Sequence, residues 1–298
     1  MSKALGASLT LAAGVCWGTA GVLGKLTMNL GYSPLTVVAY RLGLGFLILL
    51  VVALLWRGKG VLAIDRRGLM LLALAGVIGV GFGTLFYFWA VDLIGASLAV
   101  ILLYTAPIFT LLFASPSLHE RISKIKVVCV ALVFLGCYLT VKGYDLAYVK
   151  LNYLGIVIGL LAGLFYSIYI VVSKKAMSKG ASTFTVMLFT VGFGALAILI
   201  AEATMGFHQI NFTMYSVILI ALLAIIPTAL ANMLCVLGLN LTEAGRANIY
   251  STIEAVTAVI LAFIVLGERL EVLQALGCSI VIASIVMLYS SDIILKSS

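Results

Sequence analysis

Long apolar segments follow one another along almost the whole chain, and only short polar stretches separate them. An α-helix needs about 20 mainly apolar residues to cross the hydrocarbon core of a bilayer. Segments of this kind occupy residues 4–28, 33–56, 68–91, 94–115, 124–142, 151–177, 182–204, 213–238, 244–266 and 270–290. The runs are continuous rather than alternating, and irregular backbone cannot satisfy its polar groups in lipid. We therefore predict an all-α integral membrane protein with ten transmembrane helices.

The composition supports this prediction and excludes other classes. Hydrophobic residues make up 64% of the chain and charged residues only 9%, whereas a soluble domain has about 25% charged residues. The net charge of +8 comes from Lys and Arg in short loops that form no patch, so we expect no nucleic-acid partner. The five cysteines lie inside apolar segments without a CxxC pair, and no phosphate-binding loop motif occurs. We therefore expect no metal site and no cofactor.

The chain also repeats itself. Residues 11–38 align without a gap with residues 160–187, and LHER at Leu118–Arg121 aligns with LGER at Leu266–Arg269. Identical pairs in the first alignment include Gly14 with Gly163, Lys25 with Lys174, Ser33 with Ser182 and Thr36 with Thr185. Two similar apolar halves indicate a duplicated five-helix unit. We predict a first repeat at residues 1–146 and a second repeat at residues 147–298.

The distribution of Lys and Arg predicts the orientation in the membrane. If the N-terminus is cytoplasmic, thirteen of the 18 basic residues fall on the cytoplasmic side, four fall outside, and Arg41 lies within a span. The positive-inside rule therefore predicts cytoplasmic N- and C-termini, and we expect the plasma membrane. Five helices per half is an odd number, so the two halves have opposite orientations. This inverted-repeat geometry is typical of transporters that work by alternating access around a site between the halves.

Motifs in both halves resemble those of the drug/metabolite transporter superfamily, and within it the ten-helix family with two EamA domains. They are WGTAGVLGK (Trp17–Lys25), SPLTVVAYR (Ser33–Arg41), YFWAVDLIGASLAVILLYTAPIF (Tyr87–Phe109), LHER (Leu118–Arg121), LGLNLTEAGRANIYSTIEAV (Leu237–Val256) and LGERLEVLQALG (Leu266–Gly277). The resemblance implies a basket of helices around a central cavity, lined mainly by the first, third and fourth helices of each half. It also implies secondary transport, often efflux, of small metabolites such as amino acids. The sequence departs from the family's pattern at His119, where glycine is common, and at Glu254.

Glu254 is the strongest candidate for a functional residue. It lies near the middle of the ninth apolar segment, where a charged side chain costs about 2.5–3.5 kcal/mol on insertion scales. The matching position in the first half is Ala106. Intramembrane carboxyls are functional by default, so we expect Glu254 to bind a cationic group of the substrate or to carry a coupling proton. The alternative is a protonated carboxyl that joins two helices through a hydrogen bond.

Three further residues are candidates for coupling or gating. Arg41 lies about two turns into the second segment. It is either a counter-charge, for Glu254 or for a substrate carboxylate, or a cation that snorkels to the exterior and pairs with a backbone carbonyl. Pro107 and Pro227 interrupt the fourth and eighth segments, and each removes an intrahelical hydrogen bond. Transporters use such breaks as hinges and as ligands, and a packed kink without a ligand is the alternative.

Aromatic and amide side chains supply the remaining candidates. Aromatic rings with polar tips suit amino acids or organic cations through stacking and cation–π contacts, and buried amides either bind a substrate or bridge helices. The predicted substrate-binding residues, besides Glu254, are Trp17, Tyr87, Tyr104, Tyr166, Tyr250, Asn232 and Asn248. Glu120 and Glu268, just before the fifth and tenth segments, are interpreted as boundary markers that favour the following helix N-termini.

These observations favour a secondary active transporter, and an exporter of small polar metabolites such as amino acids, over an enzyme. Intramembrane catalysis would need a nucleophile–base pair or metal ligands at depth, and Glu254 has no carboxylate partner at mid-span. The alternatives are an importer of an organic cation such as a quaternary amine, and a lipid scramblase. The expected partners are a small-molecule substrate and the lipid bilayer. Proton coupling through Glu254 is an option, and the assembly is expected to be a monomer or a homodimer.

Overall fold

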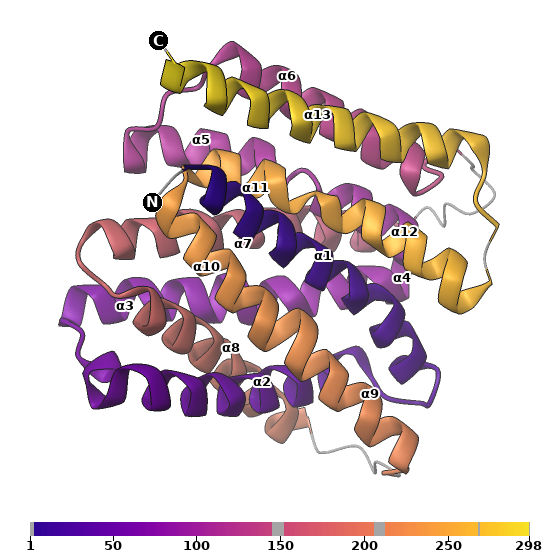
Figure 1. Ribbon diagram of the computed structural model, residues 1–298. Coiled ribbons are helices and arrows are strands. Elements are labelled where there is room, and N and C mark those ends of the chain that lie inside the picture. The colour runs from indigo at the N-terminus through magenta and orange to yellow at the C-terminus, as the bar shows by residue number, and fades with distance from the viewer. Residues whose placement is uncertain (1–2, 145–151, 206–211, 268, 298) are drawn as a thin grey trace.

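The protein forms a bundle of helices in the computed structural model, which describes residues 3–144, 152–205, 212–267 and 269–297 (Figure 1). Within these ranges every regular element is helical, so the all-α prediction is confirmed. In chain order the elements are α1 (Lys3–Met28), α2 (Pro34–Arg57), η1 (Gly58–Leu62), α3 (Arg66–Leu74), η2 (Ala75–Phe82), α4 (Gly83–Leu103), α5 (Ala106–Leu118), α6 (Lys124–Thr140), α7 (Tyr153–Ser178), α8 (Thr183–Met205), α9 (Met214–Ala224), η3 (Ile225–Leu230), α10 (Ala231–Leu241), α11 (Ala244–Ser251), α12 (Ile253–Leu266) and α13 (Val272–Ser297).

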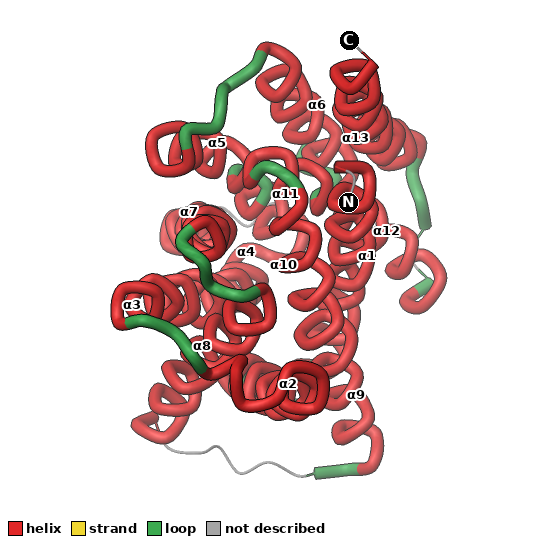
Figure 2. The backbone as a smooth tube through the Cα atoms, turned by 60° about the vertical axis from the view of Figure 1, so that its left-hand side comes forward, coloured by secondary structure: helices red, strands yellow, loops and turns green. Residues whose placement is uncertain are grey.

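Nine helical spans in the described part of the chain are long and apolar enough to cross a membrane. Their ends lie close to the predicted ones; the predicted segment 182–204, for example, is α8 at Thr183–Met205. The third and fourth spans meet inside α4 at Gly95, whose dihedral angles (φ 82°, ψ 159°) are not helical. The remaining predicted span, the fifth at 124–142, corresponds to α6, which has 17 helical residues. This shorter helix packs along α13 at one edge of the bundle (Figure 2).

The two halves run through the bundle in opposite directions. In Figure 1, α1 runs away from the end of the bundle where the chain begins, whereas its counterpart α7 runs back toward that end. The C-terminal helix α13 also finishes there, so both chain ends lie on one face, which also carries the α5–α6 and α10–α11 connections. We call this the termini face. The arrangement agrees with the predicted inverted repeats, although the predicted boundary at residues 146–147 lies outside the described residues.

Glycines let the central helices approach one another closely. A Cβ atom on Gly18 of α1 would lie 2.9 Å from the carbonyl oxygen of Glu254, and a Cβ atom on Gly79 of η2 would lie 2.6 Å from Cβ of Tyr169. Close backbone approach at small residues is typical of helices packed in membranes. It brings α1 against α12, and η2 against α7, around the centre of the bundle.

Candidate functional site

In both halves the third span changes from α-helical to π-helical geometry at equivalent places. The π-helical segment η2 ends at Phe82 and η3 ends at Leu230, and these two positions match when LHER is aligned with LGER. Segments of π-helix often mark functional sites because they displace backbone groups from the regular ladder. Pro227 lies within η3, as expected for a residue without a backbone N–H, while η2 is rich in glycine.

The fourth span of each half is broken at equivalent places. α4 gives way to α5 at Tyr104–Thr105, and α11 gives way to α12 at Thr252. Tyr104 (φ −75°, ψ 8°) and Thr252 (φ −66°, ψ −8°) match in the repeat alignment and have similar dihedral angles. The expected interruption of the fourth span is therefore present, but it begins at Tyr104 rather than at Pro107. Pro107 lies in the first turn of α5, where a missing N–H removes no intrahelical hydrogen bond.

These irregular segments surround one central cavity. Its volume is about 100 Å³, counted as the space open to the centre of a water molecule. On this measure one water needs about 10–15 Å³, so the cavity holds several waters, or a group of small-metabolite size. Its lining comes from the first, third and fourth spans of both halves, as the family resemblance implies, and from α2. The lining residues are Trp17, Ala20, Arg41, Leu42, Gly79, Val80, Gly83, Thr84, Tyr87, Leu103, Tyr104, Ala106, Tyr166, Tyr169, Asn232, Asn248, Ser251, Thr252 and Glu254.

Most of the residues singled out from the sequence come together in this cavity. Those in the lining are Trp17, Arg41, Tyr87, Tyr104, Tyr166, Asn232, Asn248 and Glu254. Tyr250 is placed differently: it is fully buried in a second cluster, with side chains of α6 and α13, and does not line the cavity. One residue farther along α11, Ser251 does line it, because successive helical side chains point about 100° apart.

Arg41 is held against the π-helical segment of the other half. Its Nε donates a hydrogen bond to Oγ1 of Thr228 (3.0 Å), and its Nη2 donates to the carbonyl oxygen of Pro227 (3.2 Å). Its guanidinium carbon lies 5.7 Å from the ring centre of Phe88, within the range of a cation–π contact. These two hydrogen bonds use two of the five N–H groups of the guanidinium. No other acceptor for the remaining donors lies in the described part of the chain, so they can meet a ligand in the cavity.

Glu254 lies in the first turn of α12, directly after the break at Thr252. A carboxylate in a first turn interacts favourably with the helix dipole. The side chain is half-buried and borders the cavity. Within the described residues its carboxyl group accepts no hydrogen bond, so both oxygen atoms are available to a ligand or to water. The predicted alternative, a carboxyl that joins two helices through a hydrogen bond, therefore has no partner in the described part of the chain.

Aromatic rings and amides form the remaining wall. Trp17 and Tyr166 meet edge to face with ring centres 5.7 Å apart, and the Tyr166 hydroxyl donates to Oγ of Ser251 (3.2 Å). The Tyr169 hydroxyl donates to Oδ1 of Asn232 (3.1 Å). The Asn232 amide in turn donates to the carbonyl of residue 228 (2.6 Å). This chain of hydrogen bonds joins α7 to the π-helical segment that also holds Arg41.

Asn248 has a bridging role as well, because its amide donates to the hydroxyl of Thr110 in α5. Sequence reasoning missed three hydroxyl residues, Thr84, Thr110 and Thr228, that line the cavity or hold its lining in place. Their side chains carry no charge and little hydropathy signal, so nothing in the sequence separates them from other threonines in the spans. Only the position of Thr228 directly after Pro227 sets it apart.

Comparison with known proteins identifies relatives of the whole chain. A model of the EamA-like transporter family matches residues 4–142 and 153–290. An uncharacterized transporter from Archaeoglobus fulgidus is 27% identical over 90% of this chain and 91% of its own length. The threonine/homoserine exporter RhtA of Escherichia coli K12 is 29% identical over 83% of this chain and 79% of its own length. A protein of known crystal structure has the same fold, with a TM-score of 0.81, 98% coverage of both chains and 18% identity.

Proposed function

Because the chain belongs to the EamA-like transporter family, we propose that it is a secondary active exporter of small polar metabolites such as amino acids. It works by alternating access around the central cavity between the two repeats, predicted at residues 1–146 and 147–298. Its relative RhtA is a threonine/homoserine exporter, which supports an amino-acid substrate. We place it in the plasma membrane, with the termini face in the cytoplasm, on the distribution of Lys and Arg.

One observation carries the proposed substrate class: the cavity has a cation from one half and a carboxyl group from the other. Arg41 belongs to the first half and Glu254 to the second, and both line the same space. A zwitterion complements this arrangement, because its carboxylate pairs with the guanidinium and its ammonium pairs with Glu254. A substrate that contacts both halves at once binds best when the halves are correctly placed relative to each other. Its affinity therefore differs between conformations, which couples binding to the conformational change.

The breaks in the third and fourth spans supply the movement. Each places irregular backbone beside the cavity, and broken helices near the membrane centre are typical of the moving elements of transporters. Rocking of one half against the other would expose the cavity to one side and then to the other. Glu254 then exchanges its substrate contact for a proton, which couples export to proton movement in the opposite direction. This coupling predicts that transport by Glu254→Gln loses its dependence on the pH gradient.

A second candidate function rests on the aromatic wall. Trp17 and Tyr166 form an edge-to-face pair, and Tyr87 and Tyr104 line the same cavity. Aromatic faces beside a carboxylate attract quaternary ammonium groups, so import of an organic cation such as a quaternary amine is the alternative. In that case Arg41 repels the substrate, whereas for a zwitterion it attracts the carboxylate. The small cavity favours either solute over a whole lipid molecule, and a flux assay with labelled lipid tests the scramblase alternative.

Thermal unfolding of the purified protein with candidate substrates tests the proposal. A ligand that binds only the folded state at 100 times its Kd stabilises that state by about 2.7 kcal/mol. Threonine, homoserine and other amino acids are compared with quaternary amines, polyamines and sugar phosphates. The proposal predicts that amino acids raise the melting temperature of the wild type and do not raise that of Glu254→Gln. Asp92→Asn serves as the control, because Asp92 is an exposed carboxylate of α4 outside the cavity lining.

Proteoliposome flux of the stabilising compound then tests transport itself. Stabilisation of the wild type by quaternary amines, with no response to amino acids, would refute the proposed substrate class and favour the cation importer. Equal stabilisation of the wild type and Glu254→Gln by an amino acid would keep the substrate class but remove Glu254 from the binding site.

A further inference from the structure

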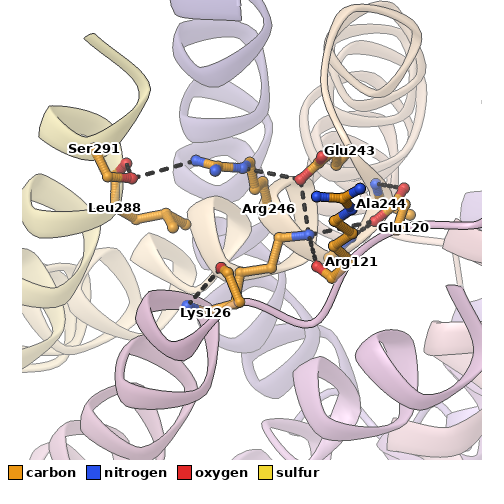
Figure 3. Close-up of polar contacts among 10 residues, drawn as sticks. Glu120, Arg121, Lys126, Glu243, Ala244, Arg246, Leu288 and Ser291 are labelled. Atoms are coloured by element: carbon orange, nitrogen blue, oxygen red, sulfur yellow. Dashed lines mark hydrogen bonds and ion pairs between the residues drawn. The ribbon is translucent and has the colours of Figure 1, made fainter. Parts of the chain in front are cut away.

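Four charged side chains gather on the termini face, where the two halves meet (Figure 3). They are Glu120 from the α5–α6 connection, Lys126 from the first turn of α6, and Glu243 and Arg246 from the start of α11. We call them the charge cluster. Lys126 and Glu243 form its central ion pair, with 2.8 Å between Nζ and Oε2, and this pair joins the first half to the second. Arg246 Nε contacts the same Glu243 oxygen at 3.0 Å.

The buried ammonium of Lys126 depends on these neighbours. Its side chain is only 2% exposed, and it also lies 3.9 Å from Glu120 and donates to the backbone carbonyl of Arg121 (2.9 Å). A buried charge is tolerated only where partners replace its hydration. Burial alone would raise the pKa of Glu243, but its hydrogen bonds and its proximity to Lys126 and Arg246 outweigh burial and lower that pKa. Both charges are therefore stabilised by the contact between the halves.

Glu120 makes a second connection between the halves. Its carboxylate accepts hydrogen bonds from the backbone N–H groups of Ala244 (2.6 Å) and Gly245 (3.1 Å). These are among the N–H groups that a helix leaves unsatisfied at its start, and the helix dipole adds to their attraction for an anion. A side chain of the first half thus caps α11 of the second half. From the sequence, Glu120 was interpreted as a boundary marker that favours the N-terminus of the following helix. Ser123 caps that helix, α6, and the hydrogen bonds of the Glu120 carboxylate go to α11.

The capped helix leads directly to the cavity. All eight residues of α11, Ala244–Ser251, are buried, and the cavity lining starts at Asn248, about one turn inward from the charge cluster. The other end of α11 is the break at Thr252, beside Glu254. Separation of the halves at the termini face must therefore break the Glu120 cap and the central ion pair. The same movement displaces the end of the helix that carries part of the lining.

Three of the four positions in the charge cluster have uncharged counterparts in the other repeat, whereas Glu120 matches Glu268, which lies outside the described residues. When LHER is aligned with LGER, Glu243 matches Gly95, Arg246 matches Leu98 and Lys126 matches Gln274. Among the described residues, Gln274 makes neutral hydrogen bonds: it donates to the carbonyl of Thr140 (3.0 Å) and accepts from the N–H of residue 271 (3.1 Å). In a transporter with inverted repeats, one state is closed at the termini face and the other at the opposite face. The two halves exchange conformations when the protein changes from one state to the other. The opposite face has its own ion pair between the halves, Lys142 with Glu271 (2.7 Å), but its side chains are 22% and 49% exposed, and exposed pairs contribute little to stability. Closure at the termini face is thus strengthened by an ion pair whose lysine is buried.

We propose that the charge cluster is the gate of the termini face, which holds that face closed and biases the resting protein toward this state. Glu120, Lys126, Glu243 and Arg246 are gating residues in this role and do not bind the substrate. The gate rests on the proposed alternating access, but its test measures conformation directly and needs no substrate. A wrong substrate assignment would leave its result unchanged.

The test measures distances between spin labels on the two halves. Genetically encoded labels at Ile122 and Asn240, which are exposed and belong to opposite halves, report on the termini face and spare the native cysteines. In the wild type we expect mainly the short distance. Lys126→Gln introduces the residue found at the matching position of the other repeat. We expect it to raise the ratio of open to closed protein about tenfold, because loss of a partly buried ion pair has an effect of about this size.

Two further variants make the result decisive. Lys124→Gln removes the same charge from the same turn of α6, but Lys124 is exposed and has no partner among the described residues, so we expect no change. Glu243→Gln removes the other end of the ion pair from a side chain that is 39% exposed, so folding is expected to persist even if Lys126→Gln unfolds. An unchanged distance distribution in Glu243→Gln, or an equal shift in Lys124→Gln, would overturn the proposal.

Discussion

Replacing Gly18 by alanine is expected to move α1 away from the start of α12, and with it the carboxyl group of Glu254. A Cβ atom at Gly18 would lie 2.6 Å from Cβ of Thr257 and 2.9 Å from the carbonyl oxygen of Glu254. Carbon atoms pack best about 3.5–4.0 Å apart, so the two helices have to separate locally by about 1 Å. Neither contact involves the end of a flexible side chain, so the backbone itself must shift.

The cost of this shift exceeds the benefit of a better helix former. Overpacking a well-packed contact costs about 1–3 kcal/mol, whereas Gly→Ala in a helix gains about 0.5–1 kcal/mol. The matched control is Gly21→Ala in the same helix, where the nearest atom to an added Cβ is the Tyr87 hydroxyl oxygen at 4.0 Å. Gly21→Ala therefore has the gain without the clash. The two variants differ in packing but share the same chemical change.

Melting temperature and proteoliposome flux of the stabilising substrate check this prediction. Gly18→Ala should melt below the wild type and transport at least about tenfold more slowly, the rate factor that corresponds to 1.4 kcal/mol. Gly21→Ala should melt at or above the wild type and keep its transport. Identical behaviour of the two variants would show that α1 is not packed tightly against α12, and would refute the inferred link between this contact and the position of Glu254.

Three more predictions follow from single contacts. Thr228→Val removes the hydroxyl that accepts from Nε of Arg41, and since a hydrogen bond to a charged group contributes about 1.5–3 kcal/mol, substrate affinity measured by thermal-shift titration should fall about tenfold or more. His119→Gly should raise the melting temperature, because His119 has left-handed dihedral angles (φ 55°, ψ 31°) that cost a non-glycine residue roughly 1–2 kcal/mol. The charge cluster should stay closed between pH 8 and pH 5.5 in the spin-label measurement. Burial raises the pKa of Glu243, but hydrogen bonds and charges from Lys126 and Arg246 outweigh burial and lower that pKa. The contribution of Glu243 to the closed state is therefore lost only as the pH falls below the ordinary glutamate range.

The apolar segments were sufficient to predict the helices because the bilayer imposes one length and one composition on every span. The predicted segment 182–204 agrees closely with α8 at Thr183–Met205. Glu254 and Arg41 could be singled out for a related reason, since an ionisable group inside a span is costly and requires a polar environment. The structure places both in the lining of one cavity.

Helix irregularity was much harder to predict. The break in the fourth span begins at Tyr104, not at Pro107, because proline is compatible with the first turn of a helix and so marks a start as readily as an interruption. Tyr250 was expected in the cavity on account of its depth in the span. Depth alone does not define the direction of a side chain, and Tyr250 points into the cluster with α6 and α13. The cap that Glu120 provides to α11 joins residues far apart in sequence, and no local pattern reports such a pairing.

The two repeats share their backbone irregularities but not the charges that line the cavity. The π-helical segments and the breaks of the fourth spans occur at matching positions in both halves. In contrast, Arg41 matches Thr190, and Glu254 matches Ala106. Symmetric breaks allow either half to move in the same way, which alternating access requires. We therefore expect substitutions at the asymmetric charged positions to change selectivity or resting conformation while the bundle itself still folds.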